Sequence, residues 1–166
     1  MKVNIALLTV TDTRTIDNDK SGGILVNKFK DANHNLIERK ICKDNKDDIV
    51  VILREWLKNE KVDVIITTGG TGLTGRDITP EALNEVAEKH IPGFGEIFRH
   101  ISIKTVGTSA IQSRACAVLS NGKYIFALPG SSGGVTDAWE GILKHQLDIN
   151  HKPCNFVELF PRLKEK

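Results

Sequence analysis

One stretch of the sequence, VDVIITTGGTGLTGRDITPEA at positions 62–82, limits the possible folds more than any other. A short apolar run at 64–66 ends in two threonines, and four glycines then fall within seven residues: Gly69, Gly70, Gly72 and Gly75. A buried strand that leads through a glycine-rich loop into a helix is a common site for an anionic ligand in an α/β sheet. Glycine permits positive φ angles and a close approach of the backbone, so N–H groups can converge on phosphate oxygens. The stretch therefore predicts an α/β fold built around a phosphate-binding loop.

Two well-known phosphate-binding patterns match this loop only in part. The segment 70–75 fits the dinucleotide-binding pattern G-x-G-x-x-G, but the helix does not start at the glycines, and no strand ending in an acidic residue follows near Glu96. The same segment has the glycine spacing of a Walker A loop, although Arg76 and Asp77 replace the lysine and the serine or threonine. We reject both patterns. A glycine-rich turn that only connects a strand to a helix remains the alternative.

Polar loops follow other predicted strands at the same edge of the sheet. The nearly continuous apolar run at 3–10 predicts a strand covered on both faces, and the polar segment 11–21 after it is either part of a ligand site or an ordinary solvated loop. The alternating segment 36–41 predicts a half-buried strand that is followed by a helix. Asp44 or Asn45 is expected to cap this helix. Because Asp44 lies at the end of a strand, it is also a candidate for the ligand site.

The second half of the chain repeats the order of strand, small-residue loop and helix. Apolar runs at 115–119 and 124–128 flank an Asn-Gly pair and predict a hairpin. The second run leads into PGSSGG at 129–134, which indicates either a second ligand loop or a simple connector. Four further helices are expected, at 21–32 capped by Ser21, at 79–89 capped by Thr79, at 94–103 and at 135–147. The tail 148–166 is expected to pack as an irregular arm.

Composition argues against several classes of protein. A chain of 166 residues is expected to form one domain, and its net charge of +2 gives no reason to expect nucleic acid or membrane binding. No apolar stretch approaches the ~20 residues of a membrane span, and Met1 leads directly into a strand without a signal peptide, so a cytoplasmic protein is expected. Three separated cysteines and five histidines show no disulfide or metal-ligand spacing. Carboxylates beside phosphate loops remain, and they favour magnesium-assisted phosphoryl or nucleotidyl transfer.

Several motifs together resemble one family. TVTDTR, TTGGTGLTGRDITPEAL, PGFGEIFR, SAIQSRA and ALPGSSGG, in this order, resemble the MoaB/MogA family of molybdenum-cofactor biosynthesis proteins and the related domains of plant Cnx and gephyrin. IQSRA and the terminal DxxxKPCNF look closer to MoaB-type members. The resemblance implies a three-layer molybdopterin-binding-type domain, with a mostly parallel central sheet and helices on both faces. It also implies a homotrimer or hexamer, and Mg-ATP-dependent adenylylation of molybdopterin with release of pyrophosphate.

The resemblance also implies roles for individual residues. The two aspartates of the family fall on Asp44 and Asp77, which would be catalytic and hold Mg²⁺ or orient the phosphates of ATP. The remaining positions would bind substrate, chiefly the phosphate of molybdopterin: Asp12, Gly69, Gly70, Thr71, Gly72, Ser113, Gly130, Ser131 and Ser132.

Two alternatives stay open at this point, and a third is disfavoured. The chain could bind molybdopterin without turning over ATP, or it could be an oligomeric scaffold that presents the intermediate to a molybdate-insertion enzyme. The molybdate-insertion step itself is disfavoured, because enzymes of that step carry this domain within longer chains. Transfer of AMP to molybdopterin would separate the enzyme from the binding protein and the scaffold.

Overall fold

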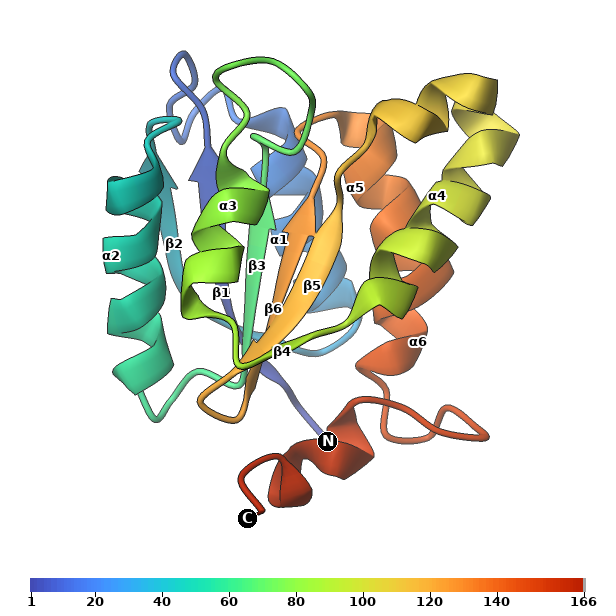
Figure 1. Cartoon of the computed structure of the whole chain (residues 1–166). Coiled ribbons are helices and arrows are strands. Elements are labelled where there is room, and N and C mark those ends of the chain that lie inside the picture. Colours follow the sequence, from blue (N-terminus) through green and yellow to red (C-terminus); the bar gives the residue numbers. More distant parts are fainter. Residues whose placement is uncertain (166) are drawn as a thin grey trace.

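A six-stranded sheet runs through the computed structural model, which describes residues 1–165 (Figure 1). The strand order is β2-β1-β3-β6-β5-β4, and the first four of these strands are mutually parallel, while β5 and β4 run antiparallel to their neighbours. The bounds are β1 Asn4–Val10, β2 Asn35–Cys42, β3 Val64–Thr68, β4 Lys89–His90, β5 Cys116–Ser120 and β6 Lys123–Leu128. The predicted mostly parallel sheet is confirmed.

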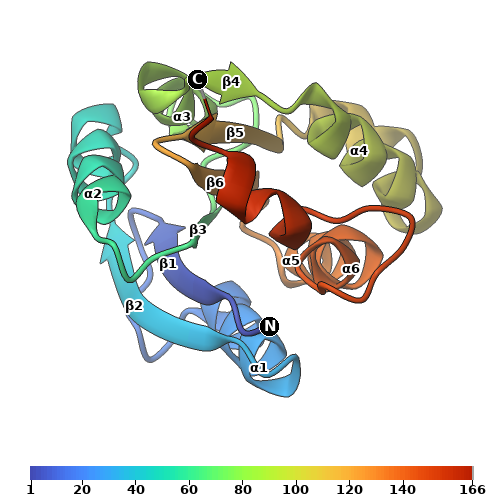
Figure 2. The ribbon, with the colours of Figure 1, turned by 90° about the horizontal axis from the view of Figure 1, so that it is seen from below.

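Helices cover both faces of this sheet, and the three layers are visible end-on in Figure 2. One face packs against α1 (Lys20–Asp31), α4 (Pro92–Val106) and α5 (Ser132–Ala138), and the other against α2 (Lys46–Lys58) and α3 (Thr79–Val86). The short helix α6 (Lys144–Gln146) contributes no buried residue. Each face has its own apolar core, centred on the fully buried Trp139 and Trp56 respectively. The central strands β1, β3 and β6 read as continuous apolar runs because both of their faces are buried.

The helix caps differ in part from the expectation. Asp19 rather than Ser21 caps α1, and it accepts the Gly22 N–H at 3.0 Å. Asn45 caps α2 by accepting the Asp48 N–H at 3.1 Å, which decides between the two candidates and leaves Asp44 without a capping role. The predicted cap at Thr79 is wrong, because its hydroxyl donates instead to Gly69 O at 2.8 Å. A nearby tertiary acceptor prevails there over the local capping preference.

Several element boundaries also differ. The helix expected to reach 89 ends at Val86, because residues 89–90 pair with β5 as the short edge strand β4. The helix expected at 94–103 extends over Pro92–Val106 and leads into a 3₁₀ helix at Gly107–Gln112. The last helix begins at Ser132, contains a π-helical turn at Trp139–Leu143 and continues as α6. The tail, expected to be irregular, contains a 3₁₀ helix at Val157–Arg162.

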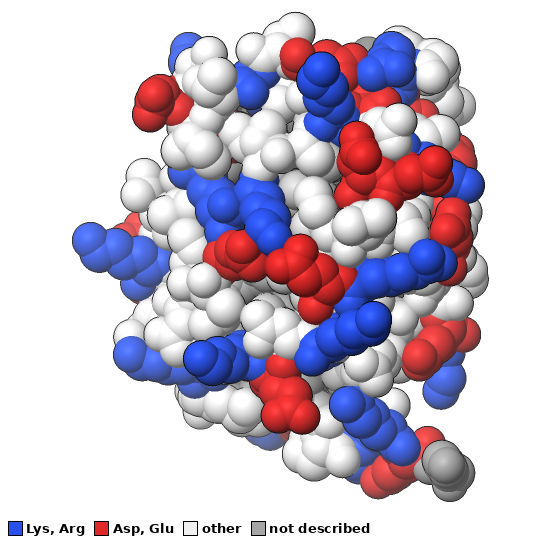
Figure 3. All heavy atoms as spheres, turned by 90° about the vertical axis from the view of Figure 1, so that its left-hand side faces the viewer, with Lys and Arg blue, Asp and Glu red and all other residues white. Residues whose placement is uncertain are grey.

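Two surface features follow directly from the sequence. The hairpin between β5 and β6 turns at Asn121 and Gly122, both with positive φ, as the Asn-Gly pair predicts. Lys, Arg, Asp and Glu side chains are interspersed over the face formed by the edge strand β2 and helix α2, where Lys40 pairs with Glu55 (Figure 3). Charges on an edge strand oppose pairing with other sheets. Among residues 1–165, no helix is both long and apolar enough to span a bilayer.

Candidate functional site

The carboxyl ends of the four parallel strands meet at the upper edge of the sheet in Figure 1, and each is followed by a loop there. The loop after β1 leads to α1 on one face of the sheet, and the loop after β3 leads to α3 on the other face. Neighbouring strands whose connections diverge in this way form the usual ligand site of an open α/β sheet. The predicted site residues occupy these loops, except Ser132, the first residue of α5, and Ser113, which lies just before β5 at the same edge.

The glycine-rich loop makes a tight turn directly after β3. Gly69 and Gly70 have φ angles of 101° and 67°, and a Cβ at Gly69 would lie 2.2 Å from Val10 O. The Gly69 N–H donates to Leu128 O at 3.0 Å, whereas the N–H groups of Gly70 and Thr71 make no hydrogen bond to another part of residues 1–165. Two neighbouring donors beside a left-handed turn form the kind of concavity that binds anions.

Asp77 lies beside Gly72 of the same loop. Its Oδ2 accepts the Thr74 N–H at 2.8 Å and the Thr74 hydroxyl at 2.7 Å, and it lies 2.8 Å from the position that a Cβ on Gly72 would take. Burial raises the pKa of Asp77, but hydrogen bonds from the Thr74 hydroxyl and from the Thr74 and Gly72 backbones outweigh burial and hold the pKa below its ordinary value. The carboxylate is therefore ionised at neutral pH and stands next to the glycine turn.

Asp44 approaches the same turn from the loop after β2. Its Oδ1 lies 3.1 Å from the position that a Cβ on Gly70 would take, and a hydrogen bond with the Asp12 backbone has only a small lowering effect on the pKa of its carboxyl. Burial, and next the negative charge of Asp12, raise the pKa of Asp44 above its ordinary value. The ionised form of this half-buried carboxylate, which lies near the carboxylates of Asp12 and Asp77, would be stabilised by a cation bound beside it.

Asp12 and Arg76 join the loop after β1 to the loop after β3. The Arg76 Nε–H donates to Asp12 Oδ2 and an Nη2–H donates to Asp12 Oδ1, both at 3.0 Å. These hydrogen bonds hold the pKa of Asp12 below its ordinary value, against a smaller effect of burial. The pair spans the point where the two connections diverge, so a ligand bound between the loops would meet both side chains.

The second small-residue loop packs directly on the first. A Cβ on Gly130 would lie 3.2 Å from the Gly69 Cα, so the two backbones are in contact. The Ser131 side chain accepts the Gly134 N–H at 3.0 Å and caps α5, while Ser132, the first residue of α5, is exposed. Arg14 connects the loop after β1 to the loop after β6, because its Nη1 donates to Gly130 O at 3.1 Å.

Ser113 reaches the glycine turn through its neighbour in the sequence. The backbone N–H of Arg114 donates to Thr71 O at 2.8 Å, which places Ser113 beside the turn. The Ser113 Oγ accepts the Ala115 N–H at 3.3 Å. A hollow of about 490 Å³ between β5 and α4 is lined in part by Ser113 and Arg114, and it adjoins this side of the site.

The carboxylates suit a hard cation, although they do not form a complete cage. Over residues 1–165, no three His, Cys, Asp or Glu side chains are grouped so that they could hold a metal ion by themselves. Magnesium ordinarily takes one or two protein carboxylates and completes its shell with water and substrate phosphates. Asp44 beside Gly70 and Asp77 beside Gly72 fit that pattern.

A comparison with known families shows to which kind of domain this candidate site belongs. The sequence profile of the family described as "Probable molybdopterin binding domain" matches residues 6–149, and this span includes every loop described above. The chain belongs to this molybdopterin-binding family.

Individual members of the family resemble the chain over nearly its full length. Molybdenum cofactor biosynthesis protein B of Escherichia coli K12 is 42% identical over 161 residues, covering 97% of this chain and 93% of its own. The protein of the same name from Staphylococcus aureus MRSA252 is 45% identical over 149 residues, covering 88% of each chain.

Solved structures of the family share the fold. A crystal structure of a molybdenum cofactor biosynthesis protein B superposes with a TM-score of 0.90 at 36% identity, covering 100% of this chain and 98% of its own. The tungsten cofactor synthesizing protein MoaB from Pyrococcus furiosus superposes with a TM-score of 0.78 at 33% identity, covering 87% and 92%. The expected three-layer architecture of this molybdopterin-binding family is confirmed.

Sequence reasoning assigned no site role to three arginines that lie in these loops. Arg76, Arg14 and Arg114 each hold loops that come from distant parts of the chain. Arg114 belongs to the SAIQSRA motif and Arg14 to TVTDTR, so the family motifs were the one signal that could have identified them. Their hydrogen-bond partners are set by the fold and not by any spacing in the sequence.

Proposed function

We propose that the protein acts in molybdenum cofactor biosynthesis by transferring AMP from ATP to molybdopterin. Membership of the molybdopterin-binding family and likeness to proteins named for molybdenum cofactor biosynthesis support the pathway. The observation that carries the chemistry is the placement of two carboxylates, Asp44 beside Gly70 and Asp77 beside Gly72, at a glycine turn with unused N–H donors. Positioning and charge neutralisation are what phosphoryl and nucleotidyl transfer require of a protein.

The glycine turn would bind the terminal phosphate of molybdopterin. The N–H groups of Gly70 and Thr71 are available to it, and the Gly130-Ser131-Ser132 loop and Ser113 would complete the phosphate site from the neighbouring strands. A phosphate oxygen held there attacks the α-phosphorus of ATP. A new P–O bond forms, the bond between the α-phosphorus and the bridging oxygen breaks, and pyrophosphate leaves with the electron pair.

Asp44 and Asp77 would hold Mg²⁺, which when bound neutralises charge on the ATP phosphates. Asp77 is prepared for this role, because its hydrogen bonds keep it ionised. Burial, and next the charge of Asp12, raise the pKa of Asp44, so its ionised form gains most from a nearby cation. Arg76 offers a second positive charge at the same edge, and Asp12 fixes its direction.

Labelled ATP tests the proposal directly. Purified protein is incubated with molybdopterin and Mg-[α-³²P]ATP, and labelled adenylyl-molybdopterin is measured. Wild type should form the product, and Asp77→Asn and Asp44→Asn should each lower kcat by about 10²-fold or more, as expected for groups that stabilise transition-state charge. Asp47→Asn, an exposed carboxylate in the first turn of α2, is the matched control and should remain near wild type. An Asp77→Asn enzyme within a factor of two of wild type would contradict the role of Asp77.

One observation favours a second candidate, a protein that binds molybdopterin without turnover. Two of the three carboxylates are already engaged, Asp77 by Thr74 and Asp12 by Arg76. Such a protein could still serve as a scaffold that hands the intermediate to a molybdate-insertion enzyme. Molybdopterin that binds to wild type without forming any labelled product would favour this candidate.

We further propose that the protein works as a homotrimer or hexamer, as the family resemblance implies. Exposed apolar side chains lie on the second half of α4 and on the 3₁₀ helix that follows it, and we propose Ile103, Val106 and Ile111 as the apolar face between copies. Ile111 is 83% exposed, which is unfavourable for an isolated chain and is relieved when a second copy covers it.

A further inference from the structure

Arg114 connects the two ends of the exposed part of the glycine-rich loop. Its Nε–H donates to Gly72 O at 2.7 Å, and an Nη2–H donates to Asp77 O at 2.9 Å. One guanidinium group therefore holds the backbone at Gly72 and at Asp77. The segment 73–76 between these two residues is exposed to solvent. The backbone N–H of Arg114 adds a third bond, to Thr71 O.

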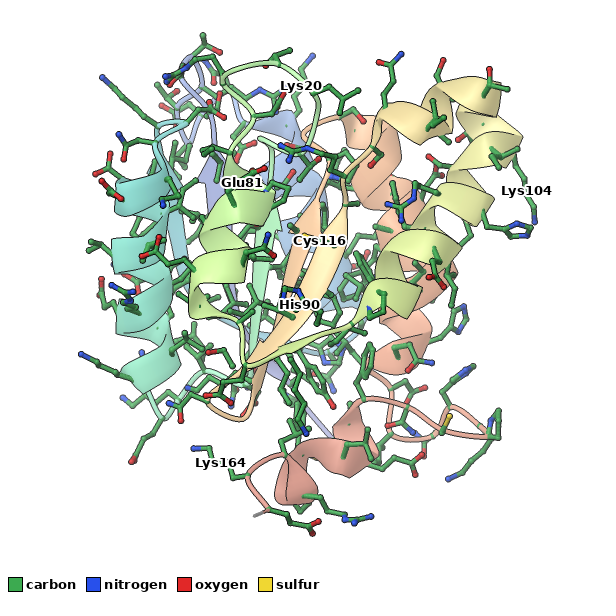
Figure 4. The ribbon with its side chains drawn as sticks, in the orientation of Figure 1. Lys20, Glu81, His90, Lys104, Cys116 and Lys164 are labelled. Carbon is green, nitrogen blue, oxygen red and sulfur yellow. The ribbon has the colours of Figure 1, made fainter. Side chains whose placement is uncertain are left out.

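Glu81 holds the guanidinium group in turn. Both outer nitrogens of Arg114 donate to the Glu81 carboxylate, from Nη1 to Oε1 and from Nη2 to Oε2 at 3.3 Å. Glu81 lies in the first turn of α3, and Figure 4 shows it on that helix, with Cys116 marking the start of β5 two residues after Arg114. The arrangement links β5, the loop and α3 through one planar group.

This geometry separates Arg114 from a phosphate-binding arginine. Each of its three side-chain nitrogens is already bonded to a protein acceptor, either a backbone carbonyl or the Glu81 carboxylate. A glycine-rich loop loses more conformational entropy on ordering than other segments, so its shape must be held from outside. The planar fork of arginine can bond two carbonyls and a carboxylate at fixed angles, whereas the single ammonium of lysine cannot reproduce the set.

We propose that Arg114 is a positioning residue that fixes the Gly72–Asp77 loop in its ligand-binding shape, with Glu81 as its anchor. Through Asp77 O it sets where the Asp77 carboxylate points, and through Gly72 O and Thr71 O it sets the direction of the N–H groups in the turn. The effect on catalysis rests on the proposed adenylyl transfer, whereas the effect on the order of the loop does not.

Hydrogen exchange tests the order of the loop in the protein without any ligand. Arg114→Lys and Glu81→Gln are compared with wild type for amide exchange across 70–78 and for the midpoint of urea unfolding. We expect exchange in this segment to rise at least tenfold in Arg114→Lys and by less in Glu81→Gln, while exchange in β1, β3 and β6 stays unchanged. Arg54→Lys is the matched control, since Arg54 also pairs with a glutamate of α3, Glu85, but does not contact the loop. Unchanged exchange at 70–78 in both test variants overturns the proposal.

Kinetics distinguish positioning from a merely structural brace. We expect Arg114→Lys to lower kcat by tenfold to 10²-fold with a smaller change in KM for ATP, because a misplaced reacting group costs rate more than binding. Added guanidinium ion should restore part of the activity of Arg114→Ala. A proportional loss of kcat and of folded protein, with no rescue, overturns the proposal. If wild type forms no adenylyl-molybdopterin, the proposed function fails, and the exchange experiment alone decides the role of Arg114.

Discussion

The backbone N–H of Asp44 donates to the Asp12 carboxylate at 3.2 Å, so two acidic residues from the loops after β2 and β1 lie side by side. Their ionisation is pushed in opposite directions. The hydrogen bond from Arg76 lowers the pKa of Asp12, while burial and then the charge of Asp12 raise the pKa of Asp44. Asp44 is consequently the carboxylate of the site that protonates first as the pH falls.

Asp12→Asn should lower the pKa of Asp44. The substitution removes a negative neighbour and leaves the positive charge of Arg76 without its partner, and both changes favour the ionised form of Asp44. A pH titration of the Asp44 carboxyl carbon by NMR measures the shift. In the assay for adenylyl transfer, the acid limb of the pH profile should move to lower pH. Asp47→Asn should leave the Asp44 titration unchanged, and an Asp44 pKa that stays constant or rises in Asp12→Asn would contradict the expectation.

Gly69→Ala should destabilise the protein by about 2–4 kcal/mol. The Ala side chain would require φ near 101° and would place Cβ 2.2 Å from Val10 O, so the β1 and β3 ends must separate. Gly75→Ala is the control in the same loop, because a Cβ there meets no atom of residues 1–165 within 4 Å. Urea unfolding of both variants measures the difference. Equal stability of the two variants would show that the turn can relax without cost.

Asp19→Asn should destabilise the protein by about 2–3 kcal/mol at neutral pH. The fully buried carboxylate accepts the Thr9 hydroxyl at 2.6 Å and an Arg39 Nη2–H at 3.0 Å, and the amide cannot replace its charge beside Arg39. Burial raises the pKa of Asp19, yet the hydrogen bonds from Thr9, Gly22 and Arg39 together hold it below the ordinary value.

The sign of the pH dependence follows from that lowered pKa. The stabilisation by Asp19 is fully present above the unfolded-state pKa of about 4 and is lost as the pH falls through the folded-state pKa. The free energies of unfolding of wild type and Asp19→Asn should therefore converge toward acid pH. Asp17→Asn, an exposed carboxylate in the same loop, should stay within about 0.5 kcal/mol of wild type throughout. A constant gap between wild type and Asp19→Asn would contradict the assignment.

The sequence predicted the features that are encoded locally. Continuous apolar runs located the central strands, since burial on both faces leaves a direct mark on composition. The glycine cluster located the loop after β3, where Gly69 and Gly70 have positive φ. Other features depend on partners far along the chain. Thr79 does not cap its helix, because Gly69 O becomes available only in the folded chain. Arg114 bonds residues about 40 positions away, and no local pattern reports such a contact.

Ile103→Lys should shift the protein toward a monomer. Ile103 is 56% exposed on α4 within the apolar face proposed to lie between copies, and a lysine there would have to be desolvated without a partner when that face is covered. Light scattering coupled to size exclusion measures the mass in solution. Val51→Lys is the matched control, because Val51 is 65% exposed on α2, away from that face, and its replacement should leave the oligomer intact. A trimer or hexamer that persists in Ile103→Lys, or a monomer in wild type, would show that this apolar face is not an interface between copies of the chain.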